Sequence, residues 1–223
     1  MFNAVRAISS RAEAMIVILG AFGLPLLTTA YLLLNHSPIP PISEQRLEHL
    51  LIFEPIVMVC LGTFLYIRGW TFERLGLKPT LRDTFIGFGL AIAAYVGLFA
   101  LWIVLMAANL KPSYLGGGAS PVNGHLLTIS VIAVSAINPI FEEVFVCGYL
   151  ITLARQKGRL ALGVNASVAL RLAYHLYQGG VGVAGVIPFG LVLAWWYGKT
   201  GRLWPAVVAH AATDLTAMLE YIG

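Results

Sequence analysis

The chain has 223 residues, of which 59% are hydrophobic and only 11% are charged. A soluble domain carries about 25% charged residues, so this composition argues against a water-soluble enzyme and favours a polytopic membrane protein. The net charge of +4 is not evidence for nucleic-acid binding, because the positions of the basic residues along the chain explain it better.

Apolar runs long enough to cross about 30 Å of hydrocarbon follow one another along the sequence. They lie at residues 14–34, 50–67, 84–110, 126–154, 160–178, 181–198 and 203–222. The sequence therefore predicts an all-α fold, a polytopic transmembrane helical bundle of about seven spans, with residues 1–223 as a single membrane domain. The first run is about 21 residues long, longer than the core of a signal peptide, and predicts an uncleaved first span.

The lysines and arginines outside these runs indicate an orientation, because cytoplasmic loops carry an excess of them. With seven spans and the N-terminus inside, the other side of the membrane holds only Arg46 and Lys111. The inner side holds Arg6, Arg11, Arg68, Arg74, Lys78, Arg82, Arg155, Lys157, Arg159, Lys199 and Arg202. We therefore expect an N-in, C-out multi-pass protein, and the short chain suits a bacterial cytoplasmic membrane.

Other polar residues are less informative. Cys60 and Cys147 both lie in apolar runs and predict no disulfide framework. Ser43 is a suitable N-cap for the helix of the second run. Glu54 lies about one turn inside that run, where a carboxylate near a helix start is stabilised by the helix dipole. This interfacial interpretation is favoured for Glu54, and a role in a functional site is the alternative.

The stretch from Pro139 to Gly148 differs, because it places two adjacent carboxylates, Glu142 and Glu143, inside an apolar run. Ionised carboxylates are costly to bury in hydrocarbon, and two neighbours repel each other. Ionisable residues within a span indicate a functional site. The candidate partners in later runs are Arg171, His175, His210 and Asp214.

Helical spacing groups these residues on shared faces. The pairs four residues apart are Asn138 with Glu142, Glu143 with Cys147, Arg171 with His175, and His210 with Asp214. Three helices can therefore turn polar faces toward one cavity. For any one of these residues alone, a polar group bonded across helices is the simpler interpretation. For Cys147 a small buried apolar residue is favoured, with a reactive or metal-binding thiolate as the alternative.

A carboxylate beside two imidazoles suits the activation of water. The glutamate takes a proton, one histidine holds the water, and the second stabilises the oxyanion that forms when water attacks a carbonyl. The same groups, Glu142, His175, His210 and Asp214, also suit zinc ligation with one open position. Spacing does not separate these alternatives, because the groups come from different helices.

Three motifs in this part of the chain resemble the CPBP family of intramembrane proteases, which includes the CAAX prenyl endopeptidases and Abi-type proteins. The family shows Glu-Glu-x-x-x-Arg, Phe-x-x-x-His and His-x-x-x-Asn or Asp motifs. This sequence has Glu142–Cys147, Arg171–His175 and His210–Asp214, and the resemblance covers about residues 139–215. It implies that Glu142 is the general base, that His175 holds the water, and that His210 and Asp214 sit at the oxyanion or second-ligand position.

The chain departs from the family pattern at two positions. Cys147 stands where the family has Arg, and Arg171 stands where it has Phe. Our hypothesis is that the cation has moved to the neighbouring helix and offsets Glu143 across the interface, with binding of a substrate carboxylate as the alternative. Asp214 in place of Asn cannot donate to an oxyanion when ionised, which makes orientation of His210 or metal binding more attractive.

The sequence thus predicts an intramembrane endopeptidase with a catalytic core of about residues 126–222. Its expected partners are the lipid bilayer and a polypeptide substrate with a membrane-embedded or lipidated segment, and no nucleic acid. The alternatives are a non-catalytic scaffold or immunity protein that binds a partner's terminus, and a proton or metal-ion carrier. The substrate and the cleavage site are not encoded in any pattern found here.

Overall fold

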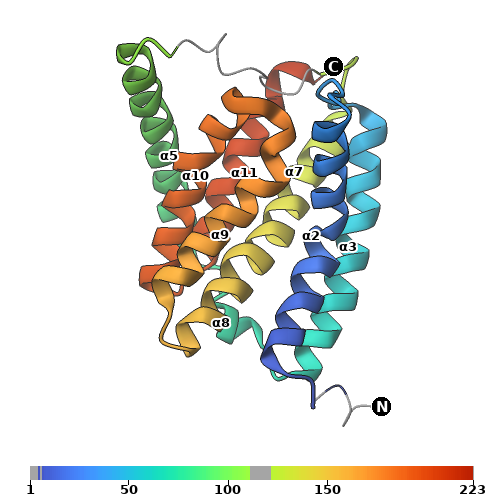
Figure 1. The fold of residues 1–223 in the computed structure, drawn as a ribbon, viewed down its shortest axis with the longest axis vertical. Helices are drawn as coiled ribbons and strands as arrows, with labels where there is room; N and C mark the ends of the chain where they lie inside the picture. Colours follow the sequence, from blue (N-terminus) through green and yellow to red (C-terminus); the bar gives the residue numbers. More distant parts are fainter. Residues whose placement is uncertain (1–4, 6, 111–121, 223) are drawn as a thin grey trace.

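The computed structural model describes Val5, residues 7–110 and residues 122–222, and it forms an upright bundle of helices (Figure 1). The helices are α2 (Ser10–Leu34), α3 (Glu44–Ile67), α4 (Phe72–Leu75), α5 (Leu81–Ala107), α7 (Thr128–Glu143), α8 (Leu150–Gln156), α9 (Leu160–His175), α10 (Gly179–Thr200) and α11 (Trp204–Met218). A π-helix, η1 (Val144–Tyr149), joins α7 to α8, and short 3₁₀ turns, η2 (Leu176–Gln178) and η3 (Leu219–Tyr221), follow α9 and α11. No strand forms within these ranges, as the prediction of an all-α fold requires.

Five helical segments in the described ranges are long and apolar enough to cross a membrane. They are Ser10–Leu34, Glu44–Ile67, Leu81–Ala107, Thr128–Gln156 and Leu160–Thr200. The last segment contains both α9 and α10, which the turn at Gly179 separates into two helices packed against each other. Helix α11 has 15 residues and falls below the length of a full span. The fold is thus a membrane-type helical bundle, while the number of seven spans stays a prediction.

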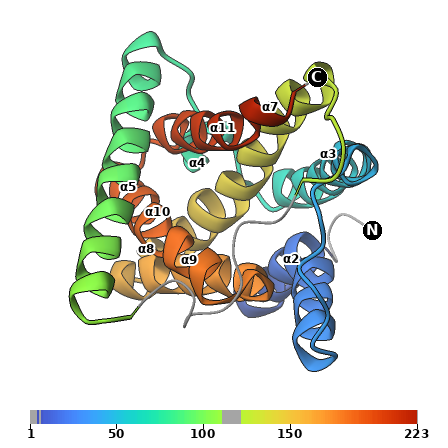
Figure 2. The same cartoon turned by 90° about the horizontal axis from the view of Figure 1, so that it is seen from above.

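The segment α7–η1–α8 runs through the middle of the bundle. Seen from above, α7 crosses between α2 and α3 on one side and α5, α10 and α11 on the other (Figure 2). It is the most enclosed of the five candidate spans. The segment can be enclosed because its inward side chains include small and aromatic residues that pack on both neighbours. The two adjacent glutamates of α7 therefore lie inside the protein and not against lipid.

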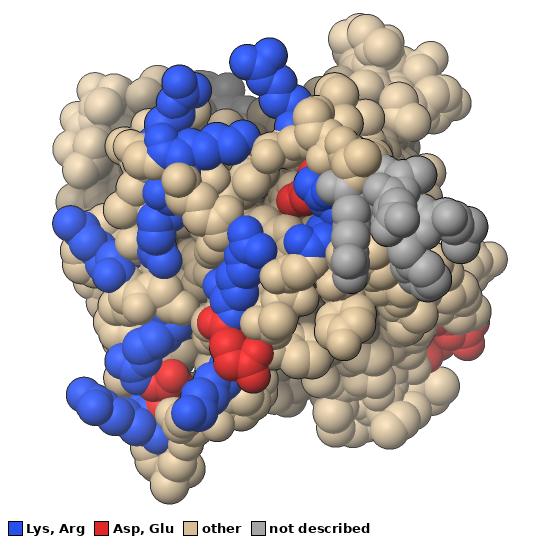
Figure 3. Space-filling model, turned by 90° about the horizontal axis from the view of Figure 1, so that it is seen from below, with Lys and Arg blue, Asp and Glu red and all other residues tan. Residues whose placement is uncertain are grey.

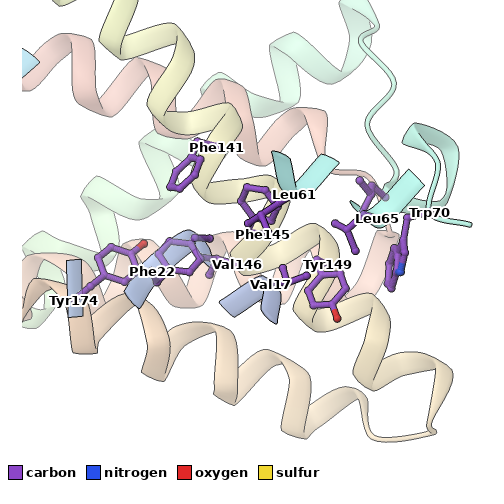
Figure 4. Close-up of a cluster of buried hydrophobic side chains, with 12 residues drawn as sticks. Val17, Phe22, Leu61, Leu65, Trp70, Phe141, Phe145, Val146, Tyr149 and Tyr174 are labelled. Carbon is purple, nitrogen blue, oxygen red and sulfur yellow. The ribbon is translucent and has the colours of Figure 1, made fainter. Parts of the chain in front are cut away.

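An aromatic cluster joins α2 and α3 to this central segment (Figure 4). Phe22 of α2 lies against both Phe141 of α7 and Tyr174 of α9, with ring centroids 5.8 and 5.1 Å apart. The rings of Phe22 and Tyr174 are nearly parallel. Such pairs add to the free energy gained by burying the rings. The cluster fixes α9 relative to α7, and so determines where the later polar residues lie.

Helix starts agree with local capping rules. The side chain of Ser43 accepts a hydrogen bond from the backbone of Arg46, as expected of an N-cap residue. Helix α7 has no capping side chain of its own. Instead, the Glu44 carboxylate accepts a hydrogen bond from the backbone of Leu127 at 3.0 Å, and Ser130 also donates to it. The start of α3 is thereby joined to the start of α7.

The N-terminal end of the bundle is strongly basic, and Figure 3 shows Lys and Arg side chains gathered on this face. Segments far apart in sequence meet here: Arg74 donates to Gln156, Arg155 to the carbonyl of Gly198, and Arg202 pairs with Asp83. The C-terminus lies at the opposite end (Figure 1). Arg6 and Lys111 lie outside the described residues. This grouping is what the positive-inside argument requires, and the N-in, C-out orientation itself stays a prediction.

Candidate active site

Glu142 and Glu143 are consecutive in α7, so their side chains leave the helix about 100° apart. Glu142 faces a pocket and keeps 10% of its side chain exposed. Glu143 points to the other side, toward α9 and α11, and is completely buried. The two carboxylates therefore have different surroundings, and only Glu142 is in reach of water.

Arg171 of α9 bridges the two carboxylates. Its Nη1 lies 3.0 Å from Oε2 of Glu142, and its Nη2 lies 2.6 Å from Oε1 of Glu143. The guanidinium is 1% exposed and lies 5.3 Å from the ring centroid of Phe189. A planar guanidinium can bond both acids at once, whereas a lysine ammonium cannot hold that geometry. The expected pairing of Arg171 with Glu143 is present, and the contact extends to Glu142. That the cation has moved from the neighbouring helix stays a hypothesis.

Tyr174 is a site residue that spacing did not single out. Its hydroxyl donates a hydrogen bond of 2.5 Å to the same oxygen of Glu142 that Arg171 contacts. The ring is held by its parallel contact with Phe22. The available signal was its position three residues after Arg171, on the same face of α9. Arg171 and Tyr174 together fix one oxygen of Glu142.

His210 of α11 lies between two carboxyl groups. Its Nδ1 is 2.8 Å from Oε1 of Glu143, and its Nε2 is 3.5 Å from Oδ1 of Asp214, one turn further along α11. The ring also meets Phe189 edge to face, with centroids 5.0 Å apart. The structure thus brings His210 to the glutamate pair, as predicted. Because both ring nitrogens face carboxyl groups, the oxyanion role of His210 stays a prediction.

The pocket in front of Glu142 has a volume of about 460 Å³. Its polar wall includes Glu54 of α3, Glu142 of α7 and His175 of α9, and its apolar wall comes mainly from α2 and α3. The Nδ1 atom of His175 is buried and has no hydrogen-bond partner in the described part of the chain. His175 thus lines the same pocket as Glu142, and its role in holding the water stays a prediction.

Glu54 lines this pocket, although an interfacial position was the favoured interpretation. Its side chain is 2% exposed, and Asn138 of α7 donates a hydrogen bond of 2.7 Å to it. Asn138 was predicted to share a face of its helix with Glu142, and from that face its side chain donates the hydrogen bond to Glu54. Helical spacing could not predict this contact, because the two residues lie on different helices and are 84 residues apart in the sequence. The alternative interpretation, a role in the site, is the one that the geometry supports.

A second pocket of about 310 Å³ lies on the other side of the site, between α5, α10 and α11. His175 lines both pockets, and Asp214 lines only the second. Of the predicted residues, Glu142, His175 and Asp214 line these two pockets, whereas Glu143, Arg171 and His210 line neither. Glu142 lines the first pocket and Asp214 lines the second, and His175 lines both.

The predicted zinc ligands do not form a ligand cluster. Within the described ranges no group of three or more His, Cys, Asp or Glu side chains could hold a metal ion, and Glu142, His175, His210 and Asp214 are all described. Glu142 is bonded to Arg171, and the two ring nitrogens of His210 lie near the carboxyl groups of Glu143 and Asp214. Cys147 is fully buried in η1 with its sulfur 3.7 Å from the hydroxyl of Ser167, which agrees with a small packing residue.

Fold and site together describe a helical membrane protein with a buried acid–base cluster next to a cavity. Residues 124–216 match the protein-family model described as Type II CAAX prenyl endopeptidase Rce1-like. The family resemblance carried by the three motifs is therefore confirmed over this segment. No curated protein and no solved structure gave a significant match.

Proposed function

We propose that this chain is an intramembrane endopeptidase in which Glu142 activates the water that attacks the peptide bond. One observation carries the proposal: Glu142 is the member of the glutamate pair that reaches a cavity, and Arg171 and Tyr174 hold it there. A general base must lie within hydrogen-bond reach of the proton it takes, and positioning of that base contributes to the rate.

The roles of the neighbouring residues follow from their contacts. His175 holds the water or the substrate carbonyl, since it lines the same pocket as Glu142. Glu143 is a positioning residue, because it bonds both Arg171 and His210 and lines neither of the two pockets described above. His210 and Asp214 complete this support from α11. The catalytic core would span about residues 126–222 of a single membrane domain, in a bacterial cytoplasmic membrane.

The substrate that we propose is a polypeptide with a membrane-embedded or lipidated segment. The wall of the pocket is mostly apolar, with Phe22, Leu50, Phe53 and Phe141 among its residues, and this suits a hydrocarbon chain. The family description adds support for a prenyl group near the scissile bond. Helices α2 and α3, which form this wall, also have many exposed apolar side chains on their outer surface.

The test is cleavage of a farnesylated peptide ending in a CAAX sequence by the full-length protein in liposomes, followed by mass spectrometry. The same peptide without the lipid serves as a comparison. We expect Glu142→Gln to lower the turnover of the lipidated peptide by about 10²- to 10⁴-fold, because the base is lost. The amide oxygen of the variant can still accept from Arg171 and Tyr174, so its thermal unfolding should change little.

Two outcomes would reject this function. Cleavage by Glu142→Gln at the wild-type rate would remove Glu142 from the chemistry. Absence of cleavage of either peptide by the folded wild-type protein would favour a non-catalytic scaffold or an ion carrier.

A further inference from the structure

Glu54 is a second carboxyl group of the pocket, and its contacts differ from those of Glu142. One oxygen accepts the hydrogen bond from Asn138, and the other is buried without a hydrogen-bond partner in the described part of the chain. No Lys, Arg or His forms an ion pair with Glu54 within the described ranges. Glu142, in contrast, has Arg171 beside it.

The two carboxyl groups lie on the same cavity. Asn138 and Glu142 are one turn apart on one face of α7, so a group bonded to Asn138 lies about one turn from Glu142. Both glutamates line the 460 Å³ pocket. The other titratable groups in its wall are Arg46, His49, Tyr174, His175 and Tyr177. Both carboxyl groups thus belong to the wall of one pocket.

The lack of a cation beside Glu54 favours the form of this carboxyl group that carries a proton. Burial of an ionised carboxylate without a cationic partner is far more costly than burial of the neutral acid. Asn138 adds one hydrogen bond, which does not replace an ion pair. One pocket is thus lined by a carboxyl group paired with Arg171 and by a carboxyl group without a cationic partner, and acid–base catalysis of hydrolysis needs two groups that differ in this way.

We propose that Glu54 is the general acid of this site, a role that rests on the hydrolase function proposed above. Glu142 takes a proton from water, and the resulting hydroxide forms a bond to the carbonyl carbon. The bond from that carbon to nitrogen breaks as the nitrogen takes the proton of Glu54, so the products are a carboxylic acid and an amine. The proton held by Glu142 then passes to Glu54 through water in the pocket and restores both groups.

The test compares two substrates of the full-length protein in liposomes: the farnesylated CAAX peptide, and the same peptide with a thioester in place of the scissile amide. A thiolate leaves without a proton near neutral pH, whereas an amine does not. We expect Glu54→Gln to lower kcat/KM for the amide at least about 100-fold and to change it less than about 3-fold for the thioester. Glu48→Gln, the same change at an exposed site on α3, should leave both rates unchanged.

The outcomes separate this inference from the function on which it rests. An equal loss on both substrates would make Glu54 a structural or positioning residue and overturn the proposal, as would an unchanged rate on the amide. Failure of the wild-type protein to cleave either substrate would reject the hydrolase function itself. The glutamine variant keeps an oxygen that can accept from Asn138, and its thermal unfolding temperature reports whether the fold is retained.

Discussion

At the scale of single residues, the site depends on how one buried cation is shared. Arg171 contacts Glu142 at 3.0 Å and Glu143 at 2.6 Å, and all three side chains are buried. Replacement of a buried ion pair by apolar residues can be tolerated, whereas removal of one partner leaves a charge that is neither solvated nor paired. Arg171 is therefore expected to stabilise the fold, because it is the cationic partner of both glutamates.

Arg171→Ala should lower the free energy of unfolding by about 3–5 kcal/mol, because two buried carboxylates lose their cation. The double change Arg171→Ala/Glu143→Gln should recover part of this loss, since one of the two unpaired charges is removed. Thermal unfolding in detergent measures both effects. A harmless single change, or a double variant no more stable than the single one, would contradict the pairing.

Chelators should leave peptide cleavage by the wild-type protein unchanged. The described His, Cys, Asp and Glu side chains form no group that could hold a metal ion, and the proposed base acts through its own carboxylate. Treatment with EDTA or phenanthroline, combined with elemental analysis of the purified protein, provides the measurement. Activity that disappears with a chelator and returns with zinc would show that a metal participates.

At the scale of the elements, the π-helix η1 follows directly after Glu143. A π-turn places an extra residue in a helix and rotates everything beyond it, and such turns often occur at functional sites. In this protein the π-helix lies between the two glutamates of α7 and the start of α8, and its residues Phe145–Tyr149 are all buried. The hydroxyl of Tyr197 lies 3.2 Å from the carbonyl of Gly148 and 2.6 Å from the hydroxyl of Thr152, which connects the turn to α10.

Helix α11 brings His210 to Glu143 because α5 packs tightly against it. A Cβ atom at Gly87 of α5 would come within 2.5 Å of Val208, so Gly87→Ala must push the helices apart. We expect a loss of about 1–3 kcal/mol in stability, together with lower activity, because His210 moves with α11. Gly89→Ala is the matched control, since its Cβ would meet nothing within 4 Å. Thermal unfolding of the pair provides the comparison, and equal effects would disprove the packing argument.

At the scale of the whole molecule, the basic N-terminal end and the opposite C-terminal end define a direction through the membrane (Figures 1 and 3). Arginines at the basic end also make specific bonds, for example from Arg68 to Glu13 at 2.5 Å. The arginines of the basic end therefore join helices to one another, and the surface they form suits the anionic cytoplasmic leaflet.

Cysteine labelling can test the predicted orientation. In a protein without Cys60 and Cys147, Lys157→Cys lies in the turn after α8 at the basic end, and His125→Cys lies before α7 at the other end. A membrane-impermeant maleimide applied to intact cells should label the cysteine at position 125 but not the one at 157. Permeabilised cells should show both. Labelling of position 157 in intact cells would reverse the orientation.

The sequence alone determined that the chain is a helical membrane protein, and it singled out Glu142 and Glu143 as the candidate site. The high apolar content and the lengths of the apolar runs follow from the cost of exposing polar groups to lipid. A pair of charged residues inside such a run indicates a functional site. The same reasoning named Arg171, His175 and His210, because each is an ionisable residue in a later apolar run.

Only the tertiary structure decided which of these residues contact one another and which of them line a pocket. Contacts such as Glu54 with Asn138 and Tyr174 with Glu142 join different helices, and helical periodicity has no information on the rotation of one helix against another. That rotation turned Glu142 to a cavity and Glu143 into the interior, and it brought Glu54 of α3 into the same pocket wall. The cause is packing, because large aromatic side chains of α2, α3 and α9 lie against α7 in one buried cluster, and protein interiors are close-packed.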